Sequence, residues 1–204
     1  MNVLVKICGL TTPQAVDVAL AAGADAVGFV FHGSSPRNVQ PQRAAVLAAR
    51  VPKRVRRVAV TLHPTQALVD AVLAAFTPDV WQTDAADFDA LALPARIERW
   101  PVLRAGGVLP TPVPARFLFE GARSGSGEVA DWTLAAALAK EGELVLGGGL
   151  DAANVGAAIR AVRPYGVDVS SGVESAPGVK DPARIDAYFT MIQRSGPVTT
   201  SQAV

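Results

Sequence analysis

Short apolar segments alternate along this sequence with longer segments of helical period, and this order limits the folds open to the chain. The short segments are rich in β-branched residues and almost continuously apolar, as parallel strands are when helices cover them. Eight strands are expected, at residues 3–8, 26–31, 55–62, 80–83, 102–105, 117–120, 144–146 and 166–170. About eight helical segments separate and follow them, so units of about 25 residues occupy nearly all of the 204-residue chain.

Two of the expected helices carry clear start signals. Thr12-Pro13 and Asp181-Pro182 each place a capping side chain before a proline, whose missing N–H is harmless in the first turn of a helix. An apolar stripe at helical spacing follows the second signal, at Ile185, Tyr188, Phe189 and Ile192. Residues 106–114 hold two glycines and three prolines, which predicts a loop or a single turn after the fifth strand.

Alternating strands and helices predict parallel βαβ units. We therefore expect a single-domain (β/α)8 barrel of the TIM type over residues 1–194, with a reduced fifth helix. A doubly wound sheet with fewer, longer units is the structural alternative. Residues 195–204 are polar and unpatterned, and we expect a frayed tail there.

Composition narrows the class of protein. Half of the residues are hydrophobic, 18% are charged and the net charge is +1, which argues against a disordered chain and against a nucleic-acid partner. No apolar run approaches the roughly 18 residues that span a bilayer, and one cysteine cannot build a disulfide scaffold. We expect a cytoplasmic protein with no membrane partner, either a monomer or a homodimer.

The last two expected strands lead into loops suited to an anion. Site residues of parallel α/β folds gather at the carboxyl ends of the strands, and barrels bind phosphate after strands seven and eight. Glycine backbone there can approach an anion closely, and hydroxyls can donate to it. The expected phosphate-binding residues are Gly148, Gly149, Ser170, Ser171 and Gly172. Each turn taken alone is also explained by the glycine that a tight turn needs.

Cys8 ends the first strand and is followed by a glycine. Most free cysteines are small buried hydrophobes, and a reactive thiol is the alternative. Lys6 shares a strand face with Cys8 by the period-2 rule, and its ammonium would favour the thiolate if that face is the barrel interior. Otherwise Lys6 is an exposed charge at the start of the strand.

Charged residues lie at or after the ends of two other strands. Arg37, in Ser35-Pro36-Arg37, can bind a carboxylate or phosphate with two hydrogen bonds. The alternative is a solvated arginine in a loop. Glu120 ends the sixth strand beside the loop at residues 121–127, a place that suits a general acid. A structural pairing of Glu120 with an arginine, such as Arg116 or Arg123, is the alternative.

Asp168 lies inside an apolar strand, where an isolated carboxylate is costly. Lys6 is its expected partner if the barrel closes. His32 and His63 lack the spacing of metal ligands, and we interpret them as incidental loop residues, with no metal site expected.

Several segments, in order along the chain, resemble one enzyme family, phosphoribosylanthranilate isomerase of tryptophan biosynthesis. They are VKICGLT at residues 5–11, GADAVGFVF at 23–31 with SPR at 35–37, GSG at 125–127 with Asp131-Trp132, GGGL at 147–150 with Asn154-Val155, and VDVSSGVE at 167–174 with Pro177-Gly178 and Lys180-Asp181. The resemblance implies an Amadori rearrangement of N-(5'-phosphoribosyl)anthranilate to 1-(2-carboxyphenylamino)-1-deoxy-D-ribulose 5-phosphate, by acid and base and without metal or organic cofactor.

The resemblance also implies roles for single residues. Cys8 matches the family's general base, and Glu120 stands where the family has an aspartate as general acid. Arg37, Gln82 and Asp168 match positions that bind the phosphorylated substrate. The extra methylene of Glu120 moves its carboxyl by about a bond length, and misplacement of about 1 Å can cost about a hundredfold in rate.

Two further departures lie in the middle of the chain. Gln82 is followed by Thr83-Asp84-Ala85 instead of leucine-histidine-glycine, and Arg104 stands where a lysine is common. Two other functions stay open at this point. One is a non-catalytic phosphate-binding barrel, and the other is a related aminoimidazole carboxamide ribonucleotide isomerase.

Overall fold

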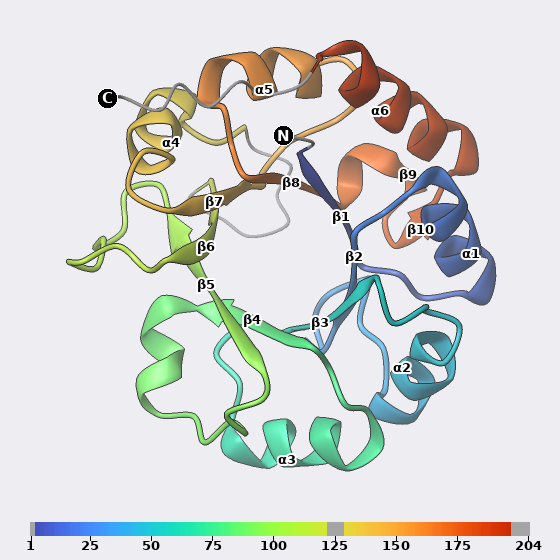
Figure 1. The fold of residues 1–204 in the computed structure, drawn as a ribbon. Coiled ribbons are helices and arrows are strands. Elements are labelled where there is room, and N and C mark those ends of the chain that lie inside the picture. The colour runs from blue at the N-terminus through green and yellow to red at the C-terminus, as the bar shows by residue number, and fades with distance from the viewer. Residues whose placement is uncertain (1–2, 122–128, 197–204) are drawn as a thin grey trace.

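The fold is a closed barrel of eight parallel strands, seen in a computed structural model that describes residues 3–121 and 129–196 (Figure 1). Strand β1 pairs with β2 on one side and with β8 on the other, which closes the sheet and confirms the predicted (β/α)8 barrel over the doubly wound alternative. The strands are β1 (Leu4–Cys8), β2 (Ala26–Val30), β3 (Arg56–Val60), β4 (Val80–Asp84), β5 (Glu98–Arg104), β6 (Arg116–Glu120), β7 (Glu143–Leu146) and β8 (Gly166–Val169).

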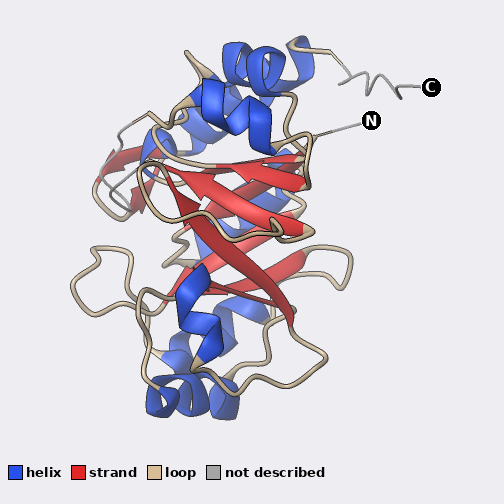
Figure 2. Ribbon diagram, turned by 90° about the vertical axis from the view of Figure 1, so that its left-hand side faces the viewer, coloured by secondary structure: helices blue, strands red, loops and turns tan. Residues whose placement is uncertain are grey.

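Helices surround the barrel, and Figure 2 shows them on both sides of the crossing strands. They are α1 (Pro13–Ala22), α2 (Pro41–Ala48), α3 (Gln66–Ala75), α4 (Trp132–Leu138), α5 (Val155–Val162) and α6 (Pro182–Arg194), with the short 3-10 helices η1 (Ala85–Asp89) and η2 (Ser171–Val173). The Thr12 hydroxyl accepts a hydrogen bond from the Ala15 N–H, and Asp181 caps α6 in the same way, so both predicted start signals are confirmed.

The number of helices was overestimated. No helix separates β5 from β6, as residues 106–114 predicted. The connection from β4 to β5 also lacks an α-helix and has only η1, which was not predicted. Pro94 prevents a helix from continuing through this short connection. The Gln66 side chain also hydrogen-bonds the backbone N–H and carbonyl of Ala92, which holds the segment as a loop.

Two other differences concern strands. Strand β5 begins at Glu98, earlier than expected. The predicted strand began after Pro101 because this proline interrupts the apolar pattern, but Pro101 pairs with Thr83 in the sheet. A small antiparallel hairpin, β9 (Glu174–Ala176) with β10 (Val179–Lys180), follows β8 and was not expected. Its two strands are too short to show a periodic pattern. Helix α6 ends at Arg194, and residues 197–204 lie outside the described residues, so the tail boundary stays a prediction.

Apolar side chains form two layers of core. The larger layer lies between strands and helices and includes Phe29, Trp81 and Phe117, all fully buried. The smaller layer fills the barrel interior and includes Val58, Trp100, Val102, Leu118 and Val145. Every second residue of a strand therefore points into the barrel. The same alternation places polar side chains in the interior near the carboxyl ends of the strands.

Candidate active site

A cavity of about 300 Å³ opens at the carboxyl ends of the strands. Nine of the ten site residues expected from the sequence line it, and they come from both halves of the chain. They are Cys8, Arg37, Gln82, Glu120, Gly148, Gly149, Asp168, Ser170 and Ser171. Barrel closure brings these residues together, because the loops after parallel strands meet at one rim.

Gly172 is the expected site residue that does not line the cavity. A Cβ at this position would lie 2.0 Å from the Leu150 carbonyl oxygen and 2.9 Å from the Asp151 Cβ. Glycine is therefore required for close packing of η2 against the loop after β7. At Gly148 and Gly149 the backbone φ values are +81° and +61°, in the left-handed region that favours glycine.

Lys6 is fully buried inside the barrel. Its Nζ lies 2.9 Å from the Asp168 Oδ1, across the β1–β8 register that pairs the two residues. The predicted pairing is confirmed, and the alternative of an exposed Lys6 is wrong. Burial acts to lower the pKa of Lys6, but the attraction of Asp168 outweighs it and the pKa is raised, so the ammonium stays charged.

Cys8 lies inside the barrel on the same face as Lys6, and it is 7% exposed. A Cβ at Gly28, the partner of Cys8 in β2, would lie 2.9 Å from the Cys8 Sγ, so the neighbouring strand leaves space for the thiol. Burial raises the pKa of Cys8, and the nearby Lys6 and Lys180 only oppose this in part. Lys6 favours the thiolate, as expected, but desolvation is the larger effect and the pKa of Cys8 is raised.

Glu120 projects from the end of β6 and contacts the guanidinium of Arg104, its register partner on β5. The Arg104 Nη2 also lies 2.5 Å from the Asp84 Oδ1 at the end of β4. Arg104, at the end of β5, thus links the two carboxylates at the ends of β4 and β6. Glu120 is therefore paired with an arginine, as the structural alternative expected, but its partner among the described residues is Arg104 and not Arg116, which pairs with Glu98 and Glu143. Arg123 and the segment 125–127 lie outside the described residues.

His63 lies at the same end of the barrel, in the loop after β3, and is largely exposed. Its Nδ1 lies 2.9 Å from the Asp87 Oδ1, and this hydrogen bond raises the pKa of His63. The Thr83 hydroxyl also donates to Asp87, at 2.5 Å. Burial acts to raise the pKa of Asp87, but these hydrogen bonds outweigh it and the pKa is lowered.

Gln82 is 5% exposed and lines the cavity from β4. Its Oε1 atom is buried and has no hydrogen-bond partner among the described residues. A buried amide oxygen without a partner costs about 1–3 kcal/mol. A ligand donor that reached this atom would remove that cost.

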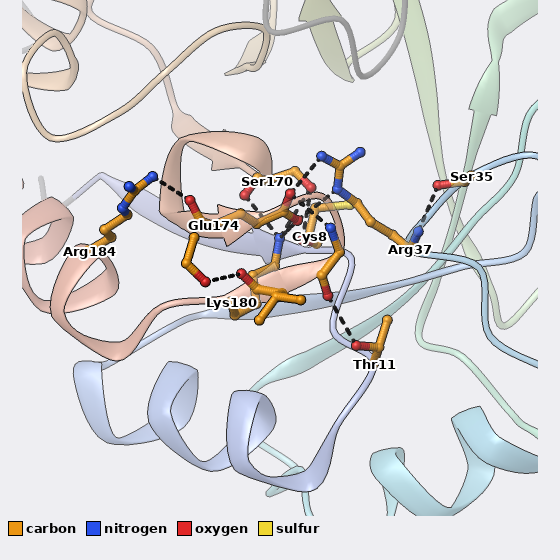
Figure 3. A network of polar contacts seen from close by, with 11 residues as sticks. Cys8, Thr11, Ser35, Arg37, Ser170, Glu174, Lys180 and Arg184 are labelled. Atoms are coloured by element: carbon orange, nitrogen blue, oxygen red, sulfur yellow. Dashed lines mark hydrogen bonds and ion pairs between the residues drawn. The ribbon is translucent and has the colours of Figure 1, made fainter.

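Arg37 lines the cavity from the loop after β2 and forms a double hydrogen bond with Glu174 at the start of β9. The Arg37 Nε and Nη2 atoms lie 2.8 Å from the Glu174 Oε1 and Oε2, respectively. Glu174 is also bonded by Lys180, whose Nζ lies 2.6 Å from Oε1 (Figure 3). Glu174 and Lys180 belong to the segments that carry the family resemblance, but sequence reasoning assigned neither of them a role.

Lys180 connects this network to the expected phosphate site. Its Nζ donates to the Ser170 carbonyl at 2.9 Å, and the Ser170 hydroxyl donates to the Cys8 carbonyl at 3.1 Å. Burial lowers the pKa of Lys180 although Glu174 acts to raise it. The hydrogen bonds from Arg37 and Lys180 outweigh burial at Glu174 and lower its pKa.

The described parts of the chain show neither a metal-binding cluster nor a membrane helix. Over residues 3–121 and 129–196, no three histidine, cysteine or carboxylate side chains are grouped so that they could hold a metal ion. Over the same residues, the helices are too short or too polar to cross a bilayer.

Comparison with known proteins places this chain among the isomerases of one family. Residues 5–191 match the family described as N-(5'phosphoribosyl)anthranilate (PRA) isomerase. A relative from Dechloromonas aromatica, named N-(5'-phosphoribosyl)anthranilate isomerase, is 42% identical over 96% of this chain and 98% of its own length.

Solved structures agree with this match. A phosphoribosyl anthranilate isomerase from Thermus thermophilus superimposes with a TM-score of 0.81 at 29% identity, covering 94% of this chain and 98% of its own. An isomerase in complex with reduced 1-(o-carboxyphenylamino)-1-deoxyribulose 5-phosphate superimposes with a TM-score of 0.77 at 29% identity, over 94% and 99% of the two chains. The eight-stranded barrel, the cavity at its carboxyl end and these matches together show that the chain belongs to the phosphoribosylanthranilate isomerase family.

Proposed function

We propose that this chain performs the family's Amadori rearrangement with Cys8 as general base and Glu120 as general acid. The observation that carries the proposal is that both side chains line one cavity, together with the two loops expected to bind phosphate. Cys8 comes from β1 and Glu120 from β6, so a ligand in the cavity has the thiol and the carboxyl group on different strands of the barrel.

The first step opens the ribose ring. Glu120 gives its proton to the ring oxygen while the bond between that oxygen and C1' breaks, and the anthranilate nitrogen lone pair forms the C1'–N double bond of a cationic Schiff base. Arg104 contacts the Glu120 carboxyl group and is itself held by Asp84. This support compensates in part for the greater freedom of a glutamate at a position where the family has an aspartate.

The second step moves a proton from C2'. The Cys8 thiol carries its proton near neutral pH because burial raises its pKa. The cationic Schiff base favours the thiolate, since an opposite charge nearby stabilises the charged form, and the thiol proton then goes to solvent. The thiolate takes the C2' proton, the C2'–H electrons form a C1'–C2' double bond, and one C1'–N electron pair returns to the anthranilate nitrogen, which leaves a neutral enol. The enol oxygen then loses its proton and C1' gains one, which gives the C2' ketone.

The remaining site residues bind the substrate. The backbone of Gly148 and Gly149 and the hydroxyls of Ser170 and Ser171 are proposed to hold the phosphate, while Arg37, Gln82 and Asp168 hold the rest of the molecule. The wide left-handed turn at Gly148 and Gly149 supports this, because it leaves backbone N–H groups near the cavity without side chains in front of them. Energy from phosphate binding then orients the reacting carbon atoms.

The test is steady-state turnover of N-(5'-phosphoribosyl)anthranilate by purified variants. Cys8→Ala and Glu120→Gln each remove one proton-transfer group, and each is expected to lower kcat about 10²- to 10⁴-fold. Asp17→Asn, which alters an exposed ion pair with Arg50, is the matched control and should retain wild-type turnover. Undiminished kcat in either test variant would remove the role assigned to that residue.

The finer setting of the protein is also a proposal. We infer a cytoplasmic enzyme that acts on a free phosphorylated substrate, because its single cysteine suits a reducing compartment. We propose a monomer or a homodimer. The homodimer is supported by a structural relative from Thermotoga maritima, 30% identical with a TM-score of 0.77, which is described as dimeric and from which monomers were generated.

A further inference from the structure

Glu174 lies behind Arg37 and is 5% exposed, and it does not line the cavity itself. Its carboxylate accepts four hydrogen bonds from the chain's own donors. The Oε1 atom accepts from Arg37 Nε and Lys180 Nζ at 2.8 and 2.6 Å, and Oε2 accepts from Arg37 Nη2 and the Gly178 N–H at 2.8 and 3.2 Å. An ionised carboxylate has about four acceptor sites, so these donors saturate Glu174. Glu174 therefore acts on a ligand only through its neighbours.

The way in which Glu174 binds Arg37 determines which edge of the guanidinium faces the cavity. A guanidinium has five N–H groups, and Glu174 occupies the edge formed by Nε and Nη2. The edge formed by Nη1 and Nη2 is the other one that can bind an anion with two hydrogen bonds. The stem of Arg37 is also restrained, because a Cβ at Gly9 would lie only 2.5 Å from the Arg37 Cδ.

The hairpin that carries Glu174 is attached to three loops of the site. The Thr11 hydroxyl, after β1, donates to the Gly178 carbonyl at 3.3 Å. Gly178 has a φ of +81°, and a Cβ there would lie 2.5 Å from the carbonyl oxygen of Pro36, in the loop after β2. Lys180 donates to Ser170 after β8, as Figure 3 shows. Glu174 is thus fixed relative to the loops after β1, β2 and β8.

We propose that Glu174 is a positioning residue for substrate binding, which holds Arg37 so that its Nη1–Nη2 edge meets an anionic group of the substrate. Arg37 is 11% exposed at its side chain and lines the cavity, so it is the group that touches the ligand. The inference rests on the proposed function for the identity of that ligand. A purely structural Glu174 would instead affect only how much of the protein is folded.

Glu174→Gln tests this role by a split between KM and kcat. The glutamine keeps the shape of the side chain, but its NH₂ group faces the N–H groups of Arg37 and releases the guanidinium. We expect KM to rise about ten- to a hundredfold while kcat of the folded enzyme stays within about threefold, because an interaction made equally in ground and transition state is lost. A structural role predicts the opposite, a lower apparent kcat at unchanged KM.

Three further measurements make the result decisive. Asp17→Asn breaks an exposed arginine–carboxylate fork with the same Nε and Nη2 geometry, to Arg50, and should leave KM unchanged. Arg37→Met/Glu174→Gln should have the KM of Arg37→Met alone, because Glu174 acts through Arg37. Glu174→Asp keeps the charge opposite Arg37 and Lys180 and withdraws the carboxylate by one methylene, so it carries the test if Glu174→Gln does not fold.

Binding is also measured without turnover, as the dissociation constant for reduced 1-(o-carboxyphenylamino)-1-deoxyribulose 5-phosphate. Glu174→Gln should weaken this binding by the same factor as it raises KM. Wild-type turnover with unchanged KM and unchanged analogue affinity in the folded Glu174 variants would overturn the inference and leave the proposed function intact. Absence of turnover in the wild type would refute the proposed function, and the analogue measurement would still decide the role of Glu174.

Discussion

The buried Lys6–Asp168 pair allows a quantitative prediction for the variant Lys6→Met. Lys6 is fully buried and the Asp168 side chain is 11% exposed, so the methionine leaves a carboxylate inside the barrel without its cation. Removal of one partner of a buried pair costs about 3–5 kcal/mol. A domain of this size loses about 2–4 °C in Tm per kcal/mol, which gives a decrease of roughly 6–20 °C.

The assay is equilibrium unfolding in urea, with the free energy of unfolding obtained by linear extrapolation. Lys53→Met is the matched control, since Lys53 is exposed, and we expect a change within about 0.5 kcal/mol there. Lys6→Met/Asp168→Asn should be more stable than Lys6→Met, because the second substitution removes the uncompensated charge. A loss below about 0.5 kcal/mol in Lys6→Met, or a double variant no more stable than the single one, would refute the reasoning.

Two other predictions concern packing and ionisation. Gly172→Ala places a Cβ 2.0 Å from the Leu150 carbonyl oxygen, so we expect a loss of about 1–3 kcal/mol in unfolding free energy. The control Gly33→Ala, with no atom within 4 Å of its Cβ, should be neutral. Equal Tm values for the two variants would contradict this prediction. Because burial raises the pKa of Cys8, its alkylation by iodoacetamide should be slow at neutral pH, with a midpoint above the ordinary thiol pKa of about 8.5. As the pH rises past about 8.5, the thiol of the unfolded chain loses its proton first, so the free energy of unfolding should fall more in the wild type than in Cys8→Ala. An alkylation midpoint at or below that of a free thiol would contradict the raised pKa of Cys8.

Local patterns were sufficient for the parts of the fold that depend on short-range physics. Continuous apolar runs predicted all eight barrel strands, because a strand covered by helices must be apolar on both faces. Thr12 and Asp181 predicted two helix starts, because a cap satisfies backbone N–H groups within the next three residues. Where a local signal was weak the prediction failed, as after β4, where the contact of Gln66 with the Ala92 backbone holds a loop behind the short η1.

Sequence patterns were sufficient to predict the class of fold and the strand ends that carry chemistry, and the family resemblance implied acid and base at Glu120 and Cys8. The Lys6–Asp168 pair was predicted from strand neighbours, but the other charge pairs of the site became visible only in the closed barrel, where partners far apart in the chain meet. Arg37 and Glu174 are 137 residues apart, and no periodic pattern connects them. The ionisation of Cys8 was also decided there, since the sequence shows Lys6 two residues away but not the burial that outweighs it.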